Sequence, residues 1–186
     1  TTTIDWQKLR AINNDIVAWI EIPNTNINYP ILKDGYNLYY LKHDYNKQYS
    51  SSGSIFTSNI NPFIENETII YGHNMKNNTM FSELGKYLKK DFLDSHNLIK
   101  IYTPNGNYKG TIFSVYSTSV NDENKNIKNL NFNERIQYYE KSSRQSINKV
   151  KNINKIIKLS TCSYLNTRTS PTDQRYYIIA SLSPIS

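Results

Sequence analysis

Residues 156–180 read I-I-K-L-S-T-C-S-Y-L-N-T-R-T-S-P-T-D-Q-R-Y-Y-I-I-A and contain the only cysteine of the chain, Cys162. An apolar run interrupted by one lysine, residues 156–159, predicts a strand buried on at least one face, so Cys162 lies where that strand ends. The polar residues that follow, one of them a proline, are typical of a loop. Arg175 then opens a second β-rich run over residues 176–180. The stretch predicts a thiol and a guanidinium at neighbouring strand ends.

A lone cysteine is a small buried hydrophobe about as often as it is a reactive group. Three features favour reactivity here: Cys162 lies at a strand end, it follows Ser160 and Thr161, and Arg175 returns across the loop. A thiolate forms near neutral pH when positive charge is close, and an arginine supplies that charge without losing its proton. Arg168 also follows the cysteine, but it lies in mid-loop, where no strand anchors it. Cys162 is therefore predicted to be a nucleophile assisted by Arg175.

A thiol nucleophile needs a partner for proton transfer, and the chain has 3 histidines: His43, His73 and His96. His73 follows the apolar strand expected over residues 67–71 and the glycine after it, so it stands at a strand end, as the cysteine does. His43 lies in a charged segment and His96 in a turn-like one, and both are predicted to be solvated surface residues. His73 is therefore the expected partner.

The segments Y-G-H-N-M-K-N-N-T-M-F (residues 71–81) and L-S-T-C (residues 159–162), followed by Arg175, resemble the sortases, the cysteine transpeptidases of Gram-positive cell surfaces. The first segment is particularly similar to class B members, and the resemblance covers most of the chain. It implies an eight-stranded β-barrel with an N-terminal helix and a long helix inserted before the cysteine strand. The sequence departs from some relatives at Ser163, where an acidic residue often follows the cysteine.

The chemistry that the resemblance implies is acyl transfer through a thioester, without a metal or a cofactor. Cys162 would attack the threonine carbonyl of a surface protein's C-terminal sorting signal, and His73 as imidazolium would protonate the departing amine. Arg175 would hold the developing oxyanion, and an amine of the peptidoglycan cross-bridge would accept the acyl group. Packing or strand hydrogen bonding explains the expected substrate-binding residues equally well. These residues are Tyr71, Ser160 and Thr161.

The resemblance also implies a location on the extracytoplasmic face of the membrane, in the cell wall of a Gram-positive bacterium. The same resemblance implies a membrane anchor N-terminal to this chain. Within the chain no stretch has the length of an apolar span or the form of a signal peptide. The formal charge of +7 suits a polyanionic wall. The lysines are spread along the chain without zinc-finger or helix-turn-helix spacing, which argues against a nucleic-acid partner.

At 186 residues the chain has the size of one domain, residues 1–186, with a helical segment over residues 1–17 and a barrel over residues 18–186. Short β-rich runs without βαβ alternation favour a mostly β, α+β fold with a closed barrel. The expected strands are 18–22, 27–32, 54–57, 67–71, 98–102, 108–119, 156–159 and 176–180. The other expected elements are helices over 4–17 (capped by Asp5), 80–88 and 132–150, and loops over 34–52 and 121–131. Within the first loop, residues 38–41 are compatible with a helical turn.

Two other functions remain open from the sequence. A plain cysteine peptidase would use the same residues with water as the acceptor. A basic module that binds wall polymer without catalysis would simply bury Cys162. Thiol labelling separates the enzyme from the module, because an unreactive Cys162 in the folded protein favours the module.

Overall fold

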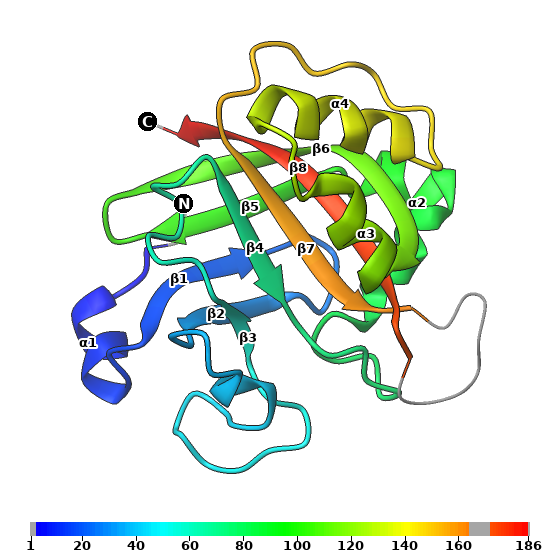
Figure 1. Cartoon of the computed structure of the whole chain (residues 1–186). Helices are drawn as coiled ribbons and strands as arrows, with labels where there is room; N and C mark the ends of the chain where they lie inside the picture. Colours follow the sequence, from blue (N-terminus) through cyan, green and yellow to red (C-terminus); the bar gives the residue numbers. More distant parts are fainter. Residues whose placement is uncertain (1–2, 164–171, 186) are drawn as a thin grey trace.

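The structure, a computed structural model, describes residues 3–163 and 172–185. The described strands form a closed barrel in the order β1-β2-β3-β4-β7-β8-β6-β5, which confirms the expected fold (Figure 1). In chain order the strands are β1 (Ile16–Glu21), β2 (Asn28–Lys33), β3 (Ile55–Thr57), β4 (Glu67–Tyr71), β5 (Leu98–Thr103), β6 (Gly106–Ser119), β7 (Ile156–Cys162) and β8 (Gln174–Ile185).

The barrel mixes parallel and antiparallel neighbours. β4 runs parallel to β7, and β7 runs antiparallel to β8. The ends of β4 and β7 and the start of β8 therefore meet at one edge of the barrel (Figure 1). A parallel pair needs a long connection, and here it carries the helices that cover the outside of β7 and β8 (Figure 1).

The helices differ in extent from those expected. In chain order they are α1 (Trp6–Ile12), the 3-10 helices η1 (Tyr39–Leu41) and η2 (Ser82–Leu88), α2 (Lys90–Ser95), α3 (Val120–Ile127) and α4 (Phe132–Ser142). The helix expected over residues 80–88 is thus mainly a 3-10 helix, and its apolar stripe joins the barrel core as expected. Among the described residues, no helix has both the length and the apolar character that crossing a membrane requires.

The N-terminal helix is shorter than predicted. Asp5 does cap it, accepting a hydrogen bond from Lys8 N at 3.0 Å. The helix ends at Ile12 because Asn13 turns the chain: its side-chain oxygen accepts from the amide of Asp15 at 2.9 Å. Such local bonds compete with helix continuation. Residues 16–17, expected in the helix, therefore begin β1.

The prediction of a loop over residues 121–131 is wrong, because most of this segment forms α3. The Ser119 side chain caps this helix by accepting from Asp122 N at 3.1 Å. The sequence of α3, V-N-D-E-N-K-N-I, is apolar only at its two ends. It therefore lacks the apolar stripe by which an amphipathic helix is usually recognised. The Ser119 cap and the acidic first turn were the available signals.

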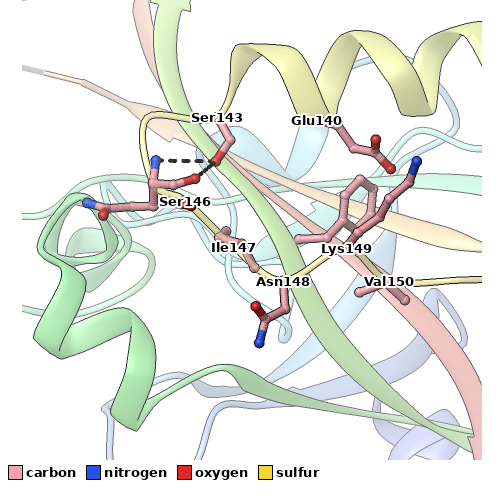
Figure 2. A pocket seen from close by; sticks show the side chains of 9 residues that line it. Glu140, Ser143, Ser146, Ile147, Asn148, Lys149 and Val150 are labelled. Carbon is pink, nitrogen blue, oxygen red and sulfur yellow. Dashed lines mark hydrogen bonds between the residues drawn. The ribbon is translucent and has the colours of Figure 1, made fainter.

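The helix predicted over residues 132–150 ends at Ser142. The next residue, Ser143, turns the chain through hydrogen bonds with the backbone of Gln145, and the extended segment that follows borders a pocket beside α4 (Figure 2). Ile147 then packs against the barrel core, whereas Val150 packs against the cluster under α4. These two side chains serve different clusters and so do not continue one helical face.

The core has two main parts, separated by the sheet. Inside the barrel, β7 contributes Ile157 and Leu159 to a large aliphatic cluster. Outside, α3 and α4 cover a second cluster against the opposite face of β7 and β8. Its members are Phe113, Tyr116, Ile127, Ile136, Tyr139, Ile156, Tyr177 and Ile179. The hydroxyls of Tyr116 and Tyr139 in this outer cluster donate to carboxylates, those of Glu123 and Glu67.

Candidate active site

The pairing of three strands sets the positions of the predicted residues. Parallel pairing places Tyr71 opposite Ser160 on β7, and the amide of Gly72 donates to the Ser160 carbonyl at 3.2 Å. His73 and Cys162 follow these two residues at the same interval, on segments that are about 4.8 Å apart where they pair. Antiparallel pairing places Cys162 directly opposite Arg175 on β8.

Contacts beyond the paired residues keep His73 and Cys162 adjacent. The side-chain amide of Asn74, the residue after the histidine, donates to the carbonyl of Cys162 at 2.9 Å. Side chains two residues apart on a strand share a face, so Ser160 and Cys162 point the same way. The structure therefore brings the predicted thiol, imidazole and guanidinium to one edge of the barrel.

Cys162 lies at a boundary in burial. The six residues before it on β7 are buried, whereas Cys162 itself is half-buried and carries a free thiol. A nucleophile must be held firmly and still be reached by its substrate. The end of a buried strand meets both conditions.

The histidine is oriented by a backbone carbonyl. His73 is half-buried, and its Nε2 lies 2.6 Å from the carbonyl oxygen of Leu41 in η1. A carbonyl only accepts, so in this contact Nε2 carries the proton. His73 O in turn accepts from Phe81 N at 2.9 Å, which fixes the loop that follows. No carboxylate is needed for this orientation.

The residue before the histidine must be small. A Cβ at Gly72 would lie 2.5 Å from the Ile55 side chain and 2.7 Å from that of Phe81. Either approach is far inside ordinary carbon contact. The glycine that the sequence places before His73 thus lets the strand end pack tightly against the barrel.

Arg175 is anchored as the sequence predicted, at the start of β8. Its Nη1 donates to the carbonyls of Thr172 at 2.7 Å and Gln174 at 2.9 Å. The side chain is half-buried, so the guanidinium is restrained and still partly accessible. Arg168, the alternative weighed from the sequence, lies outside the described residues.

The three predicted substrate-binding residues fall on two faces of the sheet. Tyr71 and Ser160 share the row next to the thiol, and the ring of Tyr71 stacks on Phe56 with centroids 5.3 Å apart. Burial, followed by the charge of Asp34, raises the pKa of the Tyr71 hydroxyl. Thr161 alternates to the opposite face and is buried. Among the described residues its hydroxyl has no hydrogen-bond partner.

The other two histidines are more enclosed than predicted. His43 stacks on the ring of Tyr39 at 3.9 Å, and His96 stacks on Phe92 at 4.0 Å. Both are half-buried rather than fully solvated. Within residues 3–163 and 172–185, no group of three His, Cys, Asp or Glu side chains is placed to hold a metal ion.

One polar cluster near the site was not predicted. Lys158, two residues before Ser160 on the same face of β7, is buried, and its Nζ lies 2.5 Å from the carboxylate of Glu123 in α3. Glu123 also accepts from the hydroxyls of Tyr116 and Tyr138. Lysine within an apolar strand was the available signal, but nothing in the sequence identified its partner.

Known proteins share both the sequence pattern and the barrel. The model of the sortase domain family matches residues 20–183. Sortase B of Listeria monocytogenes is 41% identical over 160 residues, which cover 83% of this chain and 65% of that protein. Sortase B of Staphylococcus aureus is 33% identical over 187 residues, covering 97% of this chain and 75% of that protein. The match thus spans slightly less than two thirds of the Listeria protein.

A solved structure agrees with both matches. The Staphylococcus aureus sortase B–substrate complex superposes with a TM-score of 0.84 at 31% identity, covering 97% of this chain and 85% of that chain. The sequence matches and the superposed barrel thus lead to the same assignment. The chain belongs to the sortase family of cysteine transpeptidases, within class B.

Proposed function

We propose that this chain is a transpeptidase that forms a thioester on Cys162, with His73 and Arg175 as its catalytic partners. The observation that supports this most is the convergence of three strand ends. β8 pairs Arg175 with Cys162, and the parallel register of β4 and β7 brings His73 beside them. We also propose that residues 1–186 act as one catalytic domain.

The proposed reaction has two halves. The Cys162 thiolate attacks the carbonyl carbon of the substrate threonine, and the oxyanion that forms is stabilised by the Arg175 guanidinium. The carbon–nitrogen bond then breaks, and the departing amine takes a proton from His73. In the second half an acceptor amine attacks the thioester, gives its proton to His73, and releases the thiolate with a new amide bond.

The proposed substrate is a surface protein that carries a C-terminal sorting signal, and the proposed acceptor is an amine of the peptidoglycan cross-bridge. A related sortase B has been solved in complex with a substrate, which supports substrate binding by this chain as well. Because its relatives are sortases of Gram-positive bacteria, we propose a location on the outer side of the membrane. The formal charge of +7 is compatible with a neighbouring polyanionic wall. Tyr71 and Ser160, in the row next to the thiol, are the proposed groove residues.

The decisive experiment uses fluorogenic sorting-signal peptides with the wild-type chain and Cys162→Ala. Wild type is expected to cleave one of them, and Cys162→Ala is expected to be inactive with a melting temperature close to that of wild type. Cleavage by the folded variant would remove Cys162 from its role. Thiol labelling of wild type excludes the non-catalytic module if Cys162 reacts.

Product analysis separates the transpeptidase from the plain peptidase. With hydroxylamine or a cross-bridge peptide present, mass spectrometry is expected to find the amine adduct of the peptide. If the hydrolysed acid is found without any amine adduct, the result favours the plain peptidase. A mechanism that needs Cys162 deprotonated and His73 protonated at the same time predicts a bell-shaped pH–rate profile, whose two limbs belong to the pair.

A further inference from the structure

The ladder between β4 and β7 stops at the point where the catalytic residues begin. Its last backbone bond joins the amide of Gly72 to the carbonyl of Ser160 at 3.2 Å. A parallel ladder repeats every two residues along each strand. Its next bond would join the amide of residue 74 to the carbonyl of Cys162.

In the structure a side chain occupies that place in the ladder. The carbonyl of Cys162 accepts from the side-chain amide of Asn74 at 2.9 Å. The nitrogen must be the atom that faces Cys162, because a carbonyl cannot donate. Beyond His73 the chain pairs with itself instead: Phe81 N donates to His73 O, and Asn74 forms an isolated bridge with Met80.

We propose that Asn74 is a positioning residue that sets the separation between the imidazole of His73 and the thiol of Cys162. It is covalently next to one and hydrogen-bonded to the backbone of the other. This inference rests on the proposed function of His73 and Cys162. It adds a residue that the sequence did not single out.

The strength of the expected effect follows from geometry. A misplacement of about 1 Å between reacting groups costs about 10²-fold in rate, whereas one part-buried hydrogen bond contributes little to global stability. The Leu41 carbonyl still holds the imidazole when Asn74 is changed. Loss of Asn74 should therefore lower the rate of chemistry much more than it lowers the melting temperature.

The test compares three variants. Asn74→Ala removes the donor, and Asn74→Asp keeps the shape but presents an acceptor to the Cys162 carbonyl. Asn77→Ala is the matched control: it lies in the same loop, and its side-chain oxygen accepts from the backbone amide and the hydroxyl of Thr79 within that loop. Turnover of a sorting-signal peptide, alkylation of Cys162 by iodoacetamide across pH, and the melting temperature are measured for each.

For both Asn74 variants, kcat is expected to fall about 10- to 100-fold, with KM within about threefold of wild type. The pH dependence of alkylation should shift as well, because His73 no longer stands at a fixed distance from the thiol. Asn77→Ala should match wild type in all three measurements. Asn74→Gln, which keeps a donor on a longer arm, should recover part of kcat.

The proposal is overturned if Asn74→Ala keeps kcat within about twofold, or if Asn77→Ala loses as much. It is also overturned if the loss follows the melting temperature across all variants, because that indicates a structural role alone. Alkylation does not depend on any peptide substrate. An unchanged alkylation profile in Asn74→Asp therefore contradicts the positioning role even where the proposed peptide chemistry fails. Turnover by Cys162→Ala contradicts the proposed function separately.

Discussion

The two faces of β7 are both buried, but the side chains that line them differ in polarity. Towards the barrel, Leu159 is 0% exposed and packs among aliphatic side chains. Towards α3 and α4, its neighbour Lys158 is 2% exposed and carries a charge. The same strand thus borders an apolar core on one side and a buried ionic cluster on the other. The side chain of Cys162 lies on the second face, the one that carries Lys158.

The charged face is held by directional contacts. Lys158 lies 2.5 Å from Glu123 and stands over the rings of Tyr139 and Tyr177, at 4.9 and 4.5 Å from their centroids. Burial lowers the pKa of the Lys158 ammonium, and the charge of Glu123 opposes that shift. A second pair, Arg135 with Glu67 at 2.8 Å, ties α4 to the start of β4.

The difference shows what each face can specify. Aliphatic contacts tolerate small slips of one element on another, because the hydrophobic effect has no direction. The Lys158–Glu123 pair is satisfied only when α3 sits at one place on β7. Since α3 begins directly after β6, where Thr118 pairs with Arg175, the ionic cluster also fixes the chain beside the proposed site.

The largest expected effect comes from breaking the ionic face. Lys158→Met leaves Glu123 buried without its counter-charge and should lower the free energy of unfolding by about 3–5 kcal/mol. The double variant with Glu123→Gln should recover most of that loss, because it leaves no unpaired buried charge. The amide oxygen can accept from one of the two tyrosine hydroxyls, and the amide nitrogen can donate to the other. Urea unfolding of the four members of this cycle measures the coupling. A single variant within about 1 kcal/mol of wild type would contradict the account.

The apolar face should respond in a simpler way. Leu159→Ala is expected to cost about 2–5 kcal/mol from lost burial and the cavity left behind, with no second substitution that restores it by charge. Ile185→Ala, at a side chain that is 49% exposed, is the control and should change stability by less than about 0.5 kcal/mol. Chemical denaturation distinguishes the two. Equal effects would remove the contrast between core and surface.

Arg175 tests the point where the charged face reaches the proposed site. Arg175→Lys should lower kcat/KM about 10- to 100-fold, because one ammonium cannot hold two backbone carbonyls and also face an oxyanion. Arg168→Ala is the comparison and is expected to be mild. Steady-state kinetics with a sorting-signal peptide gives the ranking. The reverse order would move the role to Arg168.

The last prediction concerns alkaline pH. Burial, followed by the charge of Glu123, raises the pKa of Tyr116 and Tyr177, and burial with Glu67 raises that of Tyr139. The pKa of each of these tyrosines is higher in the folded state than in the unfolded chain, where it is about 10. Their contribution to the free energy of unfolding is therefore fully present below about pH 10 and is lost as the pH rises above it.

Each such tyrosine should then contribute a loss of about 1.4 kcal/mol per pH unit above pH 10. Tyrosinate absorbance should rise first as the exposed tyrosines ionise, and its last increase, from the buried rings, should coincide with the loss of the folded state in melting experiments. Ionisation of all the tyrosines in a protein that stays folded would show that the outer cluster is accessible to solvent.

Local pattern was enough to predict much of this molecule. Alternation and turn residues located all eight strands of the described barrel, and the strand ends alone singled out Cys162, His73 and Arg175. These inferences needed only neighbours along the chain. The extents were less accurate: β7 continues through Cys162 and β8 to Ile185, because polar residues can pair in a ladder as well as apolar ones.

Other features were decided by tertiary structure alone. α3 has too few apolar residues to be found by periodicity, and it is stabilised by a cap and by a buried carboxylate whose partner lies on another element. The choice of Glu123 for Lys158, of the Leu41 carbonyl for His73 and of Asn74 for the Cys162 carbonyl joins residues far apart in sequence. The sequence by itself determined which strands form and which side chains end them. Which groups meet across those strands depended on the closed barrel, because hydrogen bonds and ion pairs require distances that only the packed chain sets.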